Sequence, residues 1–215
     1  MLIHPWDAAE SDEWRPFATA QGFGHLVASG AGRRRPVIVP TQYVLDGDTV
    51  LIHLARPNPI WPALDENPYV VLSIAGDWTF IPSSWRAIGD EDPAAGIPTT
   101  FYGAVQLGGT AEVIDAPEAK LDLLRRQLAH LQPDEGNVDP SAHSRRLPGI
   151  RGIRVPIEDV QAKFKYGGNT DEAHRLAVAD HLEHRDQPGD EAARAHLLRR
   201  LETNDRRDSA QCPRR

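Results

Sequence analysis

The sequence predicts an α+β fold built on a small antiparallel β-barrel. Short stretches rich in β-branched and aromatic residues recur along the chain, and turn signals such as Asp46-Gly47-Asp48 separate them. The chain lacks the regular strand–helix alternation of parallel sheets, because its clearest helical patterns lie after residue 116. The 215 residues are enough for one domain with a core and appended elements.

In the first half of the chain, short helices and hairpin strands are expected. Ser11 is a plausible N-cap for a helix that runs to Ala20, with Trp14 and Phe17 on one face. Pro59, directly after Asn58, opens a second short helix that runs through Leu64. The predicted strands cover residues 25–29, 36–45, 49–54, 69–75 and 78–81.

In the second half, residues 89–98 are acidic and rich in glycine and proline, which is typical of a loop. The clearest helix is expected over residues 117–131, where Leu121, Leu124, Leu128 and Leu131 are spaced to line one face. Strands are predicted over residues 101–114, 150–156 and 160–165, and helices over residues 171–185 and 190–201. The charged stretch from Thr203 onward contains few apolar residues and is expected to be disordered.

Composition excludes several classes of protein. The net charge of −7 disfavours a nucleic-acid binder, and no apolar run approaches the ~20 residues of a membrane span. Cys212 is the only cysteine, so disulfide and cysteine–metal frameworks are excluded. The chain contains no Walker loop, no Gly-x-Ser-x-Gly and no zinc-protease histidine pair. The first residues lack the features of a signal peptide, so we expect a cytoplasmic protein.

Lysine is rare in this chain, with three lysines against 21 arginines, and two of the three stand together in Lys163-Phe164-Lys165. Successive side chains of a strand point to opposite faces, so both ammonium groups are expected on one face and the phenyl ring on the other. Such a pair favours an anionic ligand: a phosphate, a propionate or a substrate carboxylate. A solvated edge strand whose lysines prevent aggregation is an equally good interpretation of the segment alone.

A second candidate is the segment His-Leu-Ala-Arg-Pro-Asn-Pro-Ile-Trp at residues 53–61. Arg56 precedes a predicted helix N-terminus, and an arginine beside free helix N–H groups is suited to bind an anion. The alternative is an arginine that caps its own strand. Among the nine histidines we nominate His53 as an axial metal ligand, although a lone strand histidine more often serves packing.

Two further segments expose hydroxyl groups. Pro82-Ser83-Ser84-Trp85 combines a fixed turn with two hydroxyls and an indole, which suits a ligand with anionic and aromatic parts. Thr100 and Tyr102 lie near the start of a long predicted strand, where their hydroxyls share one face. Each segment by itself is equally compatible with an ordinary turn or strand.

Taken in order, the segments at 53–61, 82–85, 98–102 (Pro-Thr-Thr-Phe-Tyr) and 163–165 resemble the motifs of the PaiB family, commonly labelled FMN-binding negative transcriptional regulators. The resemblance implies a split antiparallel β-barrel of the pyridoxamine phosphate oxidase type, with peripheral and C-terminal helices. It also implies a homodimer with ligand sites at the subunit interface. We therefore expect a split-barrel domain over residues 1–185, a C-terminal helix over 186–203 and a disordered tail over 204–215.

The chain departs from the usual family motifs at two places. The family usually has Pro-Thr-Trp-Asn-Tyr at the segment 98–102, and Leu-Ser-Gln-Asn where this chain has Tyr-Gly-Gly-Asn at residues 166–169. With these changes the chain resembles the haem-dependent piperazate synthase branch of PaiB-like proteins. Those enzymes cyclise N5-hydroxy-L-ornithine, an N-hydroxylated diamino acid, by forming a nitrogen–nitrogen bond. We therefore expect a haem b enzyme of natural-product biosynthesis.

The haem hypothesis assigns roles to the candidate residues. Those expected to contact the cofactor, with His53 as the iron ligand, are His53, Arg56, Asn58, Trp61, Ser83, Ser84 and Trp85. Those expected to take part in catalysis are Thr100, Tyr102, Lys163 and Lys165. The cations among them would neutralise haem propionates or the substrate carboxylate.

Two other functions stay open at this point. An FMN-binding oxidoreductase would use the same cations for the flavin phosphate. A transcriptional regulator without catalysis would need a DNA-binding surface, which the acidic composition disfavours. For the haem enzyme and for the FMN-binding oxidoreductase, the expected partner is a second copy of the chain, with no membrane and no nucleic acid.

Overall fold

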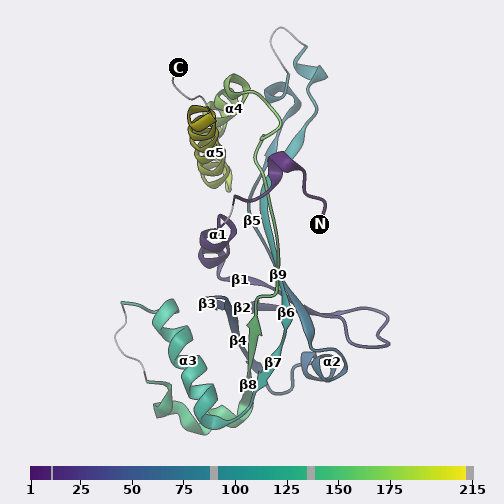
Figure 1. Ribbon diagram of the computed structural model, residues 1–215, viewed down its shortest axis with the longest axis vertical. Coiled ribbons are helices and arrows are strands. Elements are labelled where there is room, and N and C mark those ends of the chain that lie inside the picture. Colours follow the sequence, from purple (N-terminus) through teal and green to yellow (C-terminus); the bar gives the residue numbers. More distant parts are fainter. Residues whose placement is uncertain (11, 88–91, 135–138, 212–215) are drawn as a thin grey trace. The chain divides into compact units, whose positions relative to one another are not determined.

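The computed structural model describes residues 1–10, 12–87, 92–134 and 139–211, with residues 202–211 described by their backbone alone. Its strands are β1 Phe23–Ala28, β2 Val37–Gln42, β3 Val44–Asp46, β4 Thr49–Ala55, β5 Tyr69–Ile81, β6 Thr99–Thr110, β7 Glu112–Ile114, β8 Ile150–Pro156 and β9 Asp159–Lys165. Its α-helices are α1 Trp14–Gln21, α2 Ile60–Glu66, α3 Pro117–Leu131, α4 Glu172–Arg185 and α5 Asp190–Gln211 (Figure 1). Short 3₁₀ helices occupy η1 Pro5–Asp7, η2 Ser83–Trp85, η3 Pro93–Ala95 and η4 Pro140–Gly149.

The strands form two sheets. One has five strands in the order β2-β1-β5-β6-β9, and the other has four in the order β3-β4-β8-β7. Each strand pair whose register is described is antiparallel. The predicted α+β class, a split antiparallel barrel with C-terminal helices, is confirmed.

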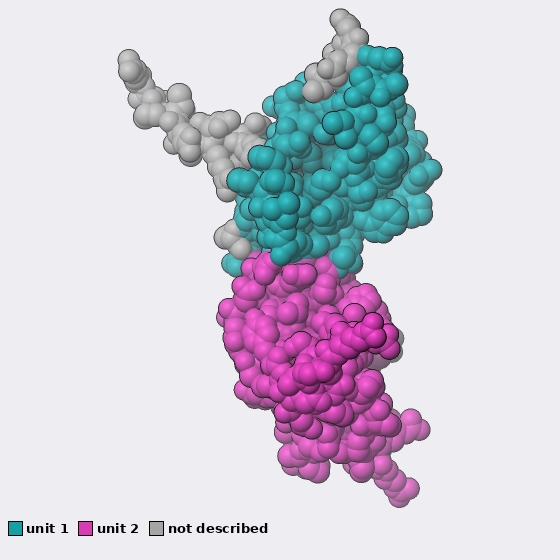
Figure 2. Space-filling view, turned by 90° about the vertical axis from the view of Figure 1, so that its right-hand side faces the viewer, with its two compact units in different colours: residues 1–13, 75–104, 162–215 teal, residues 14–74, 105–161 magenta. Residues whose placement is uncertain are grey.

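The chain divides into two compact units, coloured separately in Figure 2. Unit 1 comprises residues 1–13, 75–104 and 162–215, and unit 2 comprises residues 14–74 and 105–161. Strands β5, β6 and β9 each contribute residues to both units. Helices α4 and α5 both belong to unit 1, so the expected boundary at residue 185 falls inside this unit.

Helix α3 covers strands of unit 2 with a face that only partly overlaps the predicted one: Leu121 is buried, and Leu124 and Leu128 are half-buried. Its buried residues are Lys120, Leu121, Leu123 and Gln127, whereas Leu131 is 37% exposed. Lys120 and Gln127 can be buried because backbone carbonyl groups accept hydrogen bonds from them. Lys120 Nζ donates to Leu147 O at 2.9 Å, and Gln127 Nε2 donates to Leu51 O at 3.1 Å. The leucine spacing therefore predicted the buried face of this helix only in part.

A glycine allows α3 to approach the four-stranded sheet. Gly152 lies opposite His53 in the β4–β8 register. A Cβ atom at this position would lie 2.8 Å from Leu123 Cδ1 and 3.1 Å from Ile114 Cβ. A side chain here would therefore push the helix away from the strands.

In unit 1, α4 and α5 pack through buried Val178, Leu182, Ala193 and Leu197. The two strands predicted at 69–75 and 78–81 are one continuous strand, β5, in which Asp77 adopts a left-handed φ of 50°. Its carbonyl accepts a hydrogen bond from the Tyr166 hydroxyl at 2.9 Å. That contact compensates for the unusual backbone at this position.

Several predicted boundaries differ from those of the structure. Helix α1 begins at Trp14, and its predicted cap Ser11 lies outside the described residues. Helix α5 continues to Gln211, past the predicted end at residue 203, because extending an anchored helix costs little for each added residue. Residues 212–215 of the expected tail, and 89–91 of the expected acidic loop, lie outside the described residues.

Candidate functional site

A cavity of about 390 Å³ lies within unit 1. It falls in the usual size range of small-molecule sites, roughly 300–1,000 Å³. It is lined by His4, Trp6, Asp7, Arg86, Ile97, Pro98, Thr99, Phe101, Lys163, Lys165, Gly167 and Asn169. The lining thus combines three basic side chains, Arg86, Lys163 and Lys165, with aromatic surface.

The Lys-Phe-Lys segment on β9 forms one wall of this cavity. Phe164 is fully buried, while Lys163 and Lys165 both line the cavity, as the two-residue period of a strand predicts. Lys163 Nζ donates to Leu2 O at 3.0 Å, and Lys165 Nζ donates to Thr99 Oγ1 at 2.7 Å. Each ammonium group keeps further protons for a ligand.

Arg86, the third basic residue, was not singled out in the sequence. It directly follows η2, and its Nε is buried without a hydrogen-bond partner among the described residues. Burial lowers the pKa of this arginine. A buried guanidinium nitrogen without an acceptor is costly, so Arg86 is suited to receive an anion from the cavity.

Asp7 places a carboxylate among these cations. It is 3% exposed, and its Oδ2 lies 3.8 Å from Lys163 Nζ. Burial raises the pKa of Asp7, although Lys163 and Lys165 oppose the shift. Burial likewise lowers the pKa of Lys165, which Asp7 opposes. The cavity therefore holds an acid and a base whose charges respond to pH and to each other.

The N-terminal segment closes the cavity against the glycines that follow Lys-Phe-Lys. Trp6 stacks on His4 with ring centroids 4.8 Å apart. A Cβ atom on Gly168 would lie 2.3 Å from Trp6 O, and Gly167 has a φ of 76°. The Tyr-Gly-Gly-Asn variant thus has a local reason, because this backbone leaves no room for a side chain at residue 168.

The structure does not bring the predicted hydroxyl groups into the described lining of the cavity. Thr99 lines it in place of Thr100, and Tyr102 instead lies 5.7 Å from Lys163 Nζ, measured to its ring centroid. Ser83 and Ser84 belong to η2, which precedes Arg86. Their assigned roles stay predictions.

Trp85 packs against helix α4. Its ring stacks on His181 with centroids 4.8 Å apart, and Arg185 Cζ lies 4.6 Å from its ring centroid. The indole is therefore held between two side chains of unit 1. A role for Trp85 in covering a cofactor stays a prediction.

His53 lies in unit 2, on β4, and its side chain is exposed. Its Nδ1 lies 2.7 Å from Gln127 Oε1 on α3. Gln127 is 4% exposed, so the imidazole is held by a buried amide. Sequence reasoning could not identify this partner, because 74 residues separate the two side chains.

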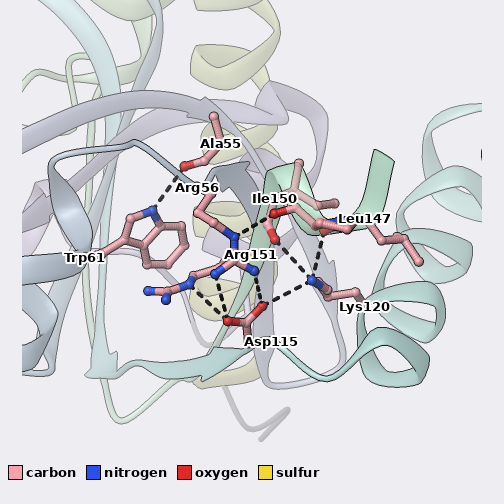
Figure 3. A network of polar contacts seen from close by, with 9 residues as sticks. Ala55, Arg56, Trp61, Asp115, Lys120, Leu147, Ile150 and Arg151 are labelled. Carbon is pink, nitrogen blue, oxygen red and sulfur yellow. Dashed lines mark hydrogen bonds and ion pairs between the residues drawn. The ribbon is translucent and has the colours of Figure 1, made fainter. Parts of the chain in front are cut away.

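The guanidinium of Arg56 is held by the carboxylate of Asp115, another residue of unit 2, as Figure 3 shows. Its guanidinium makes two bonds to Asp115, at 3.0 and 2.5 Å, and its Nε donates to Pro148 O at 2.6 Å. Lys120 and Arg151 also contact Asp115, at 3.1 and 3.2 Å. The side-chain hydrogen bond from Arg56 is the largest cause of the lowered pKa of Asp115. Arg56 therefore joins the end of β4 to Asp115 and to η4, contacts that the sequence did not predict, and its role in binding a cofactor stays a prediction.

The other two residues of the segment 53–61 stabilise the local backbone. Asn58 Oδ1 accepts a hydrogen bond from Ile60 N at 3.0 Å, at the start of α2. Trp61 is 5% exposed, and its Nε1 donates to Ala55 O at 3.0 Å. Both contacts fix the turn that follows β4, and the predicted cofactor contacts stay untested.

The described part of the chain offers neither a cluster of metal ligands nor a membrane-spanning helix. No group of three or more His, Cys, Asp or Glu residues there is arranged to hold a metal ion. None of the helices in that part has the length and apolar content that crossing a membrane requires.

A family model and a curated relative each match most of the chain. Residues 1–159 match a family model described as "Putative FMN-binding domain". The chain is 25% identical over 179 residues to the protease synthase and sporulation protein PAI 2 of Bacillus subtilis, covering 80% of this chain and 84% of that protein.

Solved structures share the fold at low sequence identity. The flavocytochrome Anf3 of Azotobacter vinelandii has a TM-score of 0.57 at 19% identity, over 80% of each chain. An FAD and haem binding protein of Mycobacterium smegmatis has a TM-score of 0.59 at 18% identity, over 80% of this chain and 78% of that one. The conserved protein Rv2991 of Mycobacterium tuberculosis has a TM-score of 0.58 at 12% identity, over 80% and 95%.

Proposed function

Because the chain belongs to the PaiB-like family of FMN-binding split-barrel proteins, we propose that it binds FMN, with the flavin phosphate in the cavity of unit 1. The observation that carries this proposal is the buried, unpartnered Nε of Arg86 beside Lys163 and Lys165. A phosphate dianion supplies acceptors for all three side chains. The aromatic surface of Trp6 and Phe101 suits the flat ring system of a flavin.

FMN would supply hydride and electron transfer, and the protein would supply binding and orientation. Lys165 and Arg86 would hold the phosphate. Asp7, whose pKa is raised by burial, would exchange a proton with the ligand, and Lys163 Nζ lies 3.8 Å from its carboxylate. An oxidoreductase of this kind is the first candidate function.

The test is a comparison of FMN with riboflavin, which lacks the phosphate. Purified protein carrying FMN should show bands at ~375 and ~450 nm. Arg86→Met should weaken FMN binding roughly 10- to 100-fold, because a charge-assisted hydrogen bond contributes about 1.5–3 kcal/mol, and riboflavin binding should not change. Arg34→Met, at an exposed arginine of unit 2, is the matched control. Equal losses for FMN and riboflavin would refute the phosphate assignment.

Haem-dependent formation of piperazate is a second candidate, and the contact between His53 and Gln127 favours it. A histidine whose Nδ1 is held by an acceptor presents Nε2 as a metal ligand. Two solved proteins with this fold are described as a flavocytochrome and as an FAD and haem binding protein. Haem iron would supply Lewis acidity toward the hydroxylamine oxygen of N5-hydroxy-L-ornithine.

This reaction balances within one substrate molecule. The N5–O bond breaks, the α-amine nitrogen bonds to N5, and the oxygen leaves as water, with no external oxidant. The attacking amine must be neutral for this step, so its binding site would have to lower the pKa of that amine. Much of the remaining task is orientation.

One set of spectra separates the two candidates. Haem bound through His53 predicts a Soret band near ~400 nm that His53→Ala removes. Flavin bands without a Soret band would exclude the haem candidate. Formation of the cyclic hydrazine from N5-hydroxy-L-ornithine, followed by mass spectrometry, tests the reaction itself.

We also propose a homodimer, supported by an apolar sheet face in unit 2. Along the β1–β2 ladder the half-buried Val27 pairs with the exposed Ile38, and Phe23 lies on the same face of β1 as Val27, with His25 between them. Phe23 is 56% exposed and Ile38 is 57% exposed. Light scattering of the wild type should give a dimer mass, and Ile38→Lys should give a monomer. A monomeric wild type would refute the proposal.

A further inference from the structure

We infer that Asp7 determines which phosphate ester the cavity of unit 1 prefers. Its carboxylate accepts a hydrogen bond from a hydroxyl group of the ligand, so the preferred ligand is the phosphate monoester of a polyol. This role rests on the proposed function, because it takes the phosphate to lie beside Arg86 and Lys165. It adds a second contact, to the chain that carries the phosphate, which in FMN is the ribityl group.

The carboxylate of Asp7 is buried in the wall of this cavity. The residue is 3% exposed and lines the cavity. Its Oδ2 lies 3.8 Å from Lys163 Nζ, which is too far for a hydrogen bond, and among the residues that the structure describes no group donates a hydrogen bond to the carboxylate. A buried carboxylate without a donor is costly, and burial is the largest cause of its raised pKa. A donor on the ligand would remove that cost.

Backbone contacts hold Asp7 in place before a ligand arrives. Asp7 N donates to His4 O at 2.9 Å, within the 3₁₀ turn η1. The residues on either side of Asp7 are held by one side chain, because Arg200 donates to Trp6 O at 3.0 Å and to Ala8 O at 2.8 Å. The carboxylate is therefore preorganised, and little conformational entropy is lost when a ligand binds.

The cations that would hold the phosphate lie within electrostatic reach of this carboxylate. Burial is the largest cause of the lowered pKa of Lys165, and the charges of Asp7 and Arg86 also act on it. Both groups thus act on the same ammonium group, and all three side chains line a cavity of about 390 Å³. A ligand only a few carbon atoms long can therefore contact the cations with its phosphate and Asp7 with a hydroxyl group.

The charge balance of the lining favours a hydroxyl group over an ammonium group as the donor. The three basic side chains and the one carboxylate give the lining a net charge of +2, with histidine counted as neutral. A phosphate dianion balances this charge, and neutral hydroxyl groups leave it balanced. An ammonium group on the ligand would leave an excess positive charge among cations that repel it, and an amino-acid zwitterion would compensate none of the excess.

A phosphate ester without hydroxyl groups should bind more weakly. It would displace water from the cavity and leave the carboxylate of Asp7 without a donor. Sites that bind a ligand hydroxyl group discriminate strongly against analogues that lack it, because the protein's own polar group is then left unpaired. For one hydrogen bond to a charged group, the expected difference in affinity is about 10- to 100-fold.

Calorimetric titrations with ribitol 5-phosphate and with n-pentyl phosphate test this role in the wild type. The two esters have the same phosphate and the same carbon chain, and they differ only in the hydroxyl groups. The wild type should bind ribitol 5-phosphate about 10- to 100-fold more tightly than pentyl phosphate. Equal affinities for the two esters would overturn the inference.

Substitutions of Asp7 identify the acceptor. Asp7→Leu should abolish the preference and should bind pentyl phosphate at least as tightly as the wild type does, because a negative charge near the phosphate is removed. Asp7→Asn keeps an acceptor oxygen and should keep a preference for ribitol 5-phosphate. Asp65→Leu, at an exposed position of α2, is the matched control and should behave as the wild type. A preference that survives Asp7→Leu would refute the role of Asp7.

The results also separate this role from the proposed function. If neither ester binds to the wild type or displaces FMN, the phosphate assignment itself is refuted. If both esters bind and compete with FMN, but the preference is absent or does not depend on Asp7, the phosphate assignment stands and only the role of Asp7 is refuted.

Discussion

Replacing Asp190 with asparagine should destabilise unit 1 in a pH-dependent way. Asp190 is 1% exposed and accepts hydrogen bonds from Thr79 Oγ1 at 2.5 Å, Gln187 N at 2.9 Å and Arg185 Nη2 at 2.6 Å. Burial opposes ionisation of this carboxyl, but the hydrogen bond from Arg185 and the other contacts outweigh it and lower the pKa from 3.8 to about 2.

The lowered pKa sets the size and sign of the effect. A fall of this pKa from 3.8 to about 2 corresponds to about 2.5 kcal/mol of unfolding free energy. Because the folded-state pKa is depressed, this contribution is fully present above the unfolded pKa near 4 and is lost as the pH falls through about 2. Asp190→Asn should therefore lower Tm by roughly 4–8 °C at pH 7, and the difference should shrink between pH 4 and pH 2.

Thermal unfolding at several pH values provides the assay. The indole of Trp85, whose ring centroid lies 4.6 Å from Arg185 Cζ, offers a fluorescence probe inside the same unit. Asp186→Asn is the matched control, because Asp186 is exposed at the end of α4 and its substitution removes the same charge. A difference that does not vary with pH, or an equal loss in the control, would refute the reasoning.

Three further predictions concern the cavity of unit 1. Gly168→Ala should weaken FMN binding in a fluorescence titration, because the added Cβ would lie 2.3 Å from Trp6 O, whereas Gly149→Ala, with no heavy atom within 4 Å, should not. Burial lowers the pKa of Lys165, so FMN affinity should fall as the pH rises through a value below 10.5. Lys165→Arg should abolish this fall. A variant with the same pH profile as the wild type would contradict the prediction. Burial raises the pKa of Asp7 above 3.8, so FMN affinity should rise as the pH falls through that raised value. Asp7→Asn should bind FMN more tightly at pH 7, and its affinity should not rise further in acid. Parallel pH profiles for the wild type and the variant would contradict this prediction.

Local periodicity predicted the Lys-Phe-Lys wall correctly but not its neighbours. The alternation of side chains along β9 depends only on strand geometry, so Phe164 is buried and both lysines line the cavity. Asp7 is brought beside Lys163 by an N-terminal segment that meets β9 at the bridge between Ala8 and Lys163. No short-range pattern in the sequence reports such a contact.

The candidate residues were expected to form one pocket, and the structure assigns them to both compact units. His53 and Arg56 belong to unit 2, whereas Trp85, Thr100 and Lys163 belong to unit 1. The prediction for α3 gave the correct bounds but only part of the buried face, for a related reason. Leucine spacing reports apolar burial only, and buried Lys120 changes which face of the helix packs because its charge finds carbonyl partners.

The three separated segments of unit 1 have a consequence for how the protein is made. Glu13 binds Arg200 across a separation of 187 residues, so at roughly 5–20 residues per second the N-terminal segment waits about 10–40 s on the ribosome for its partner. The described core of unit 2, in contrast, needs nothing beyond residue 161. The cavity of unit 1 is therefore complete only after α5 has been synthesised, because Arg200 also donates to O of the lining residue Trp6, and a ligand of this cavity would bind after translation. An N-terminal fusion that delays this docking should lower the yield of ligand-loaded protein more than the yield of folded unit 2.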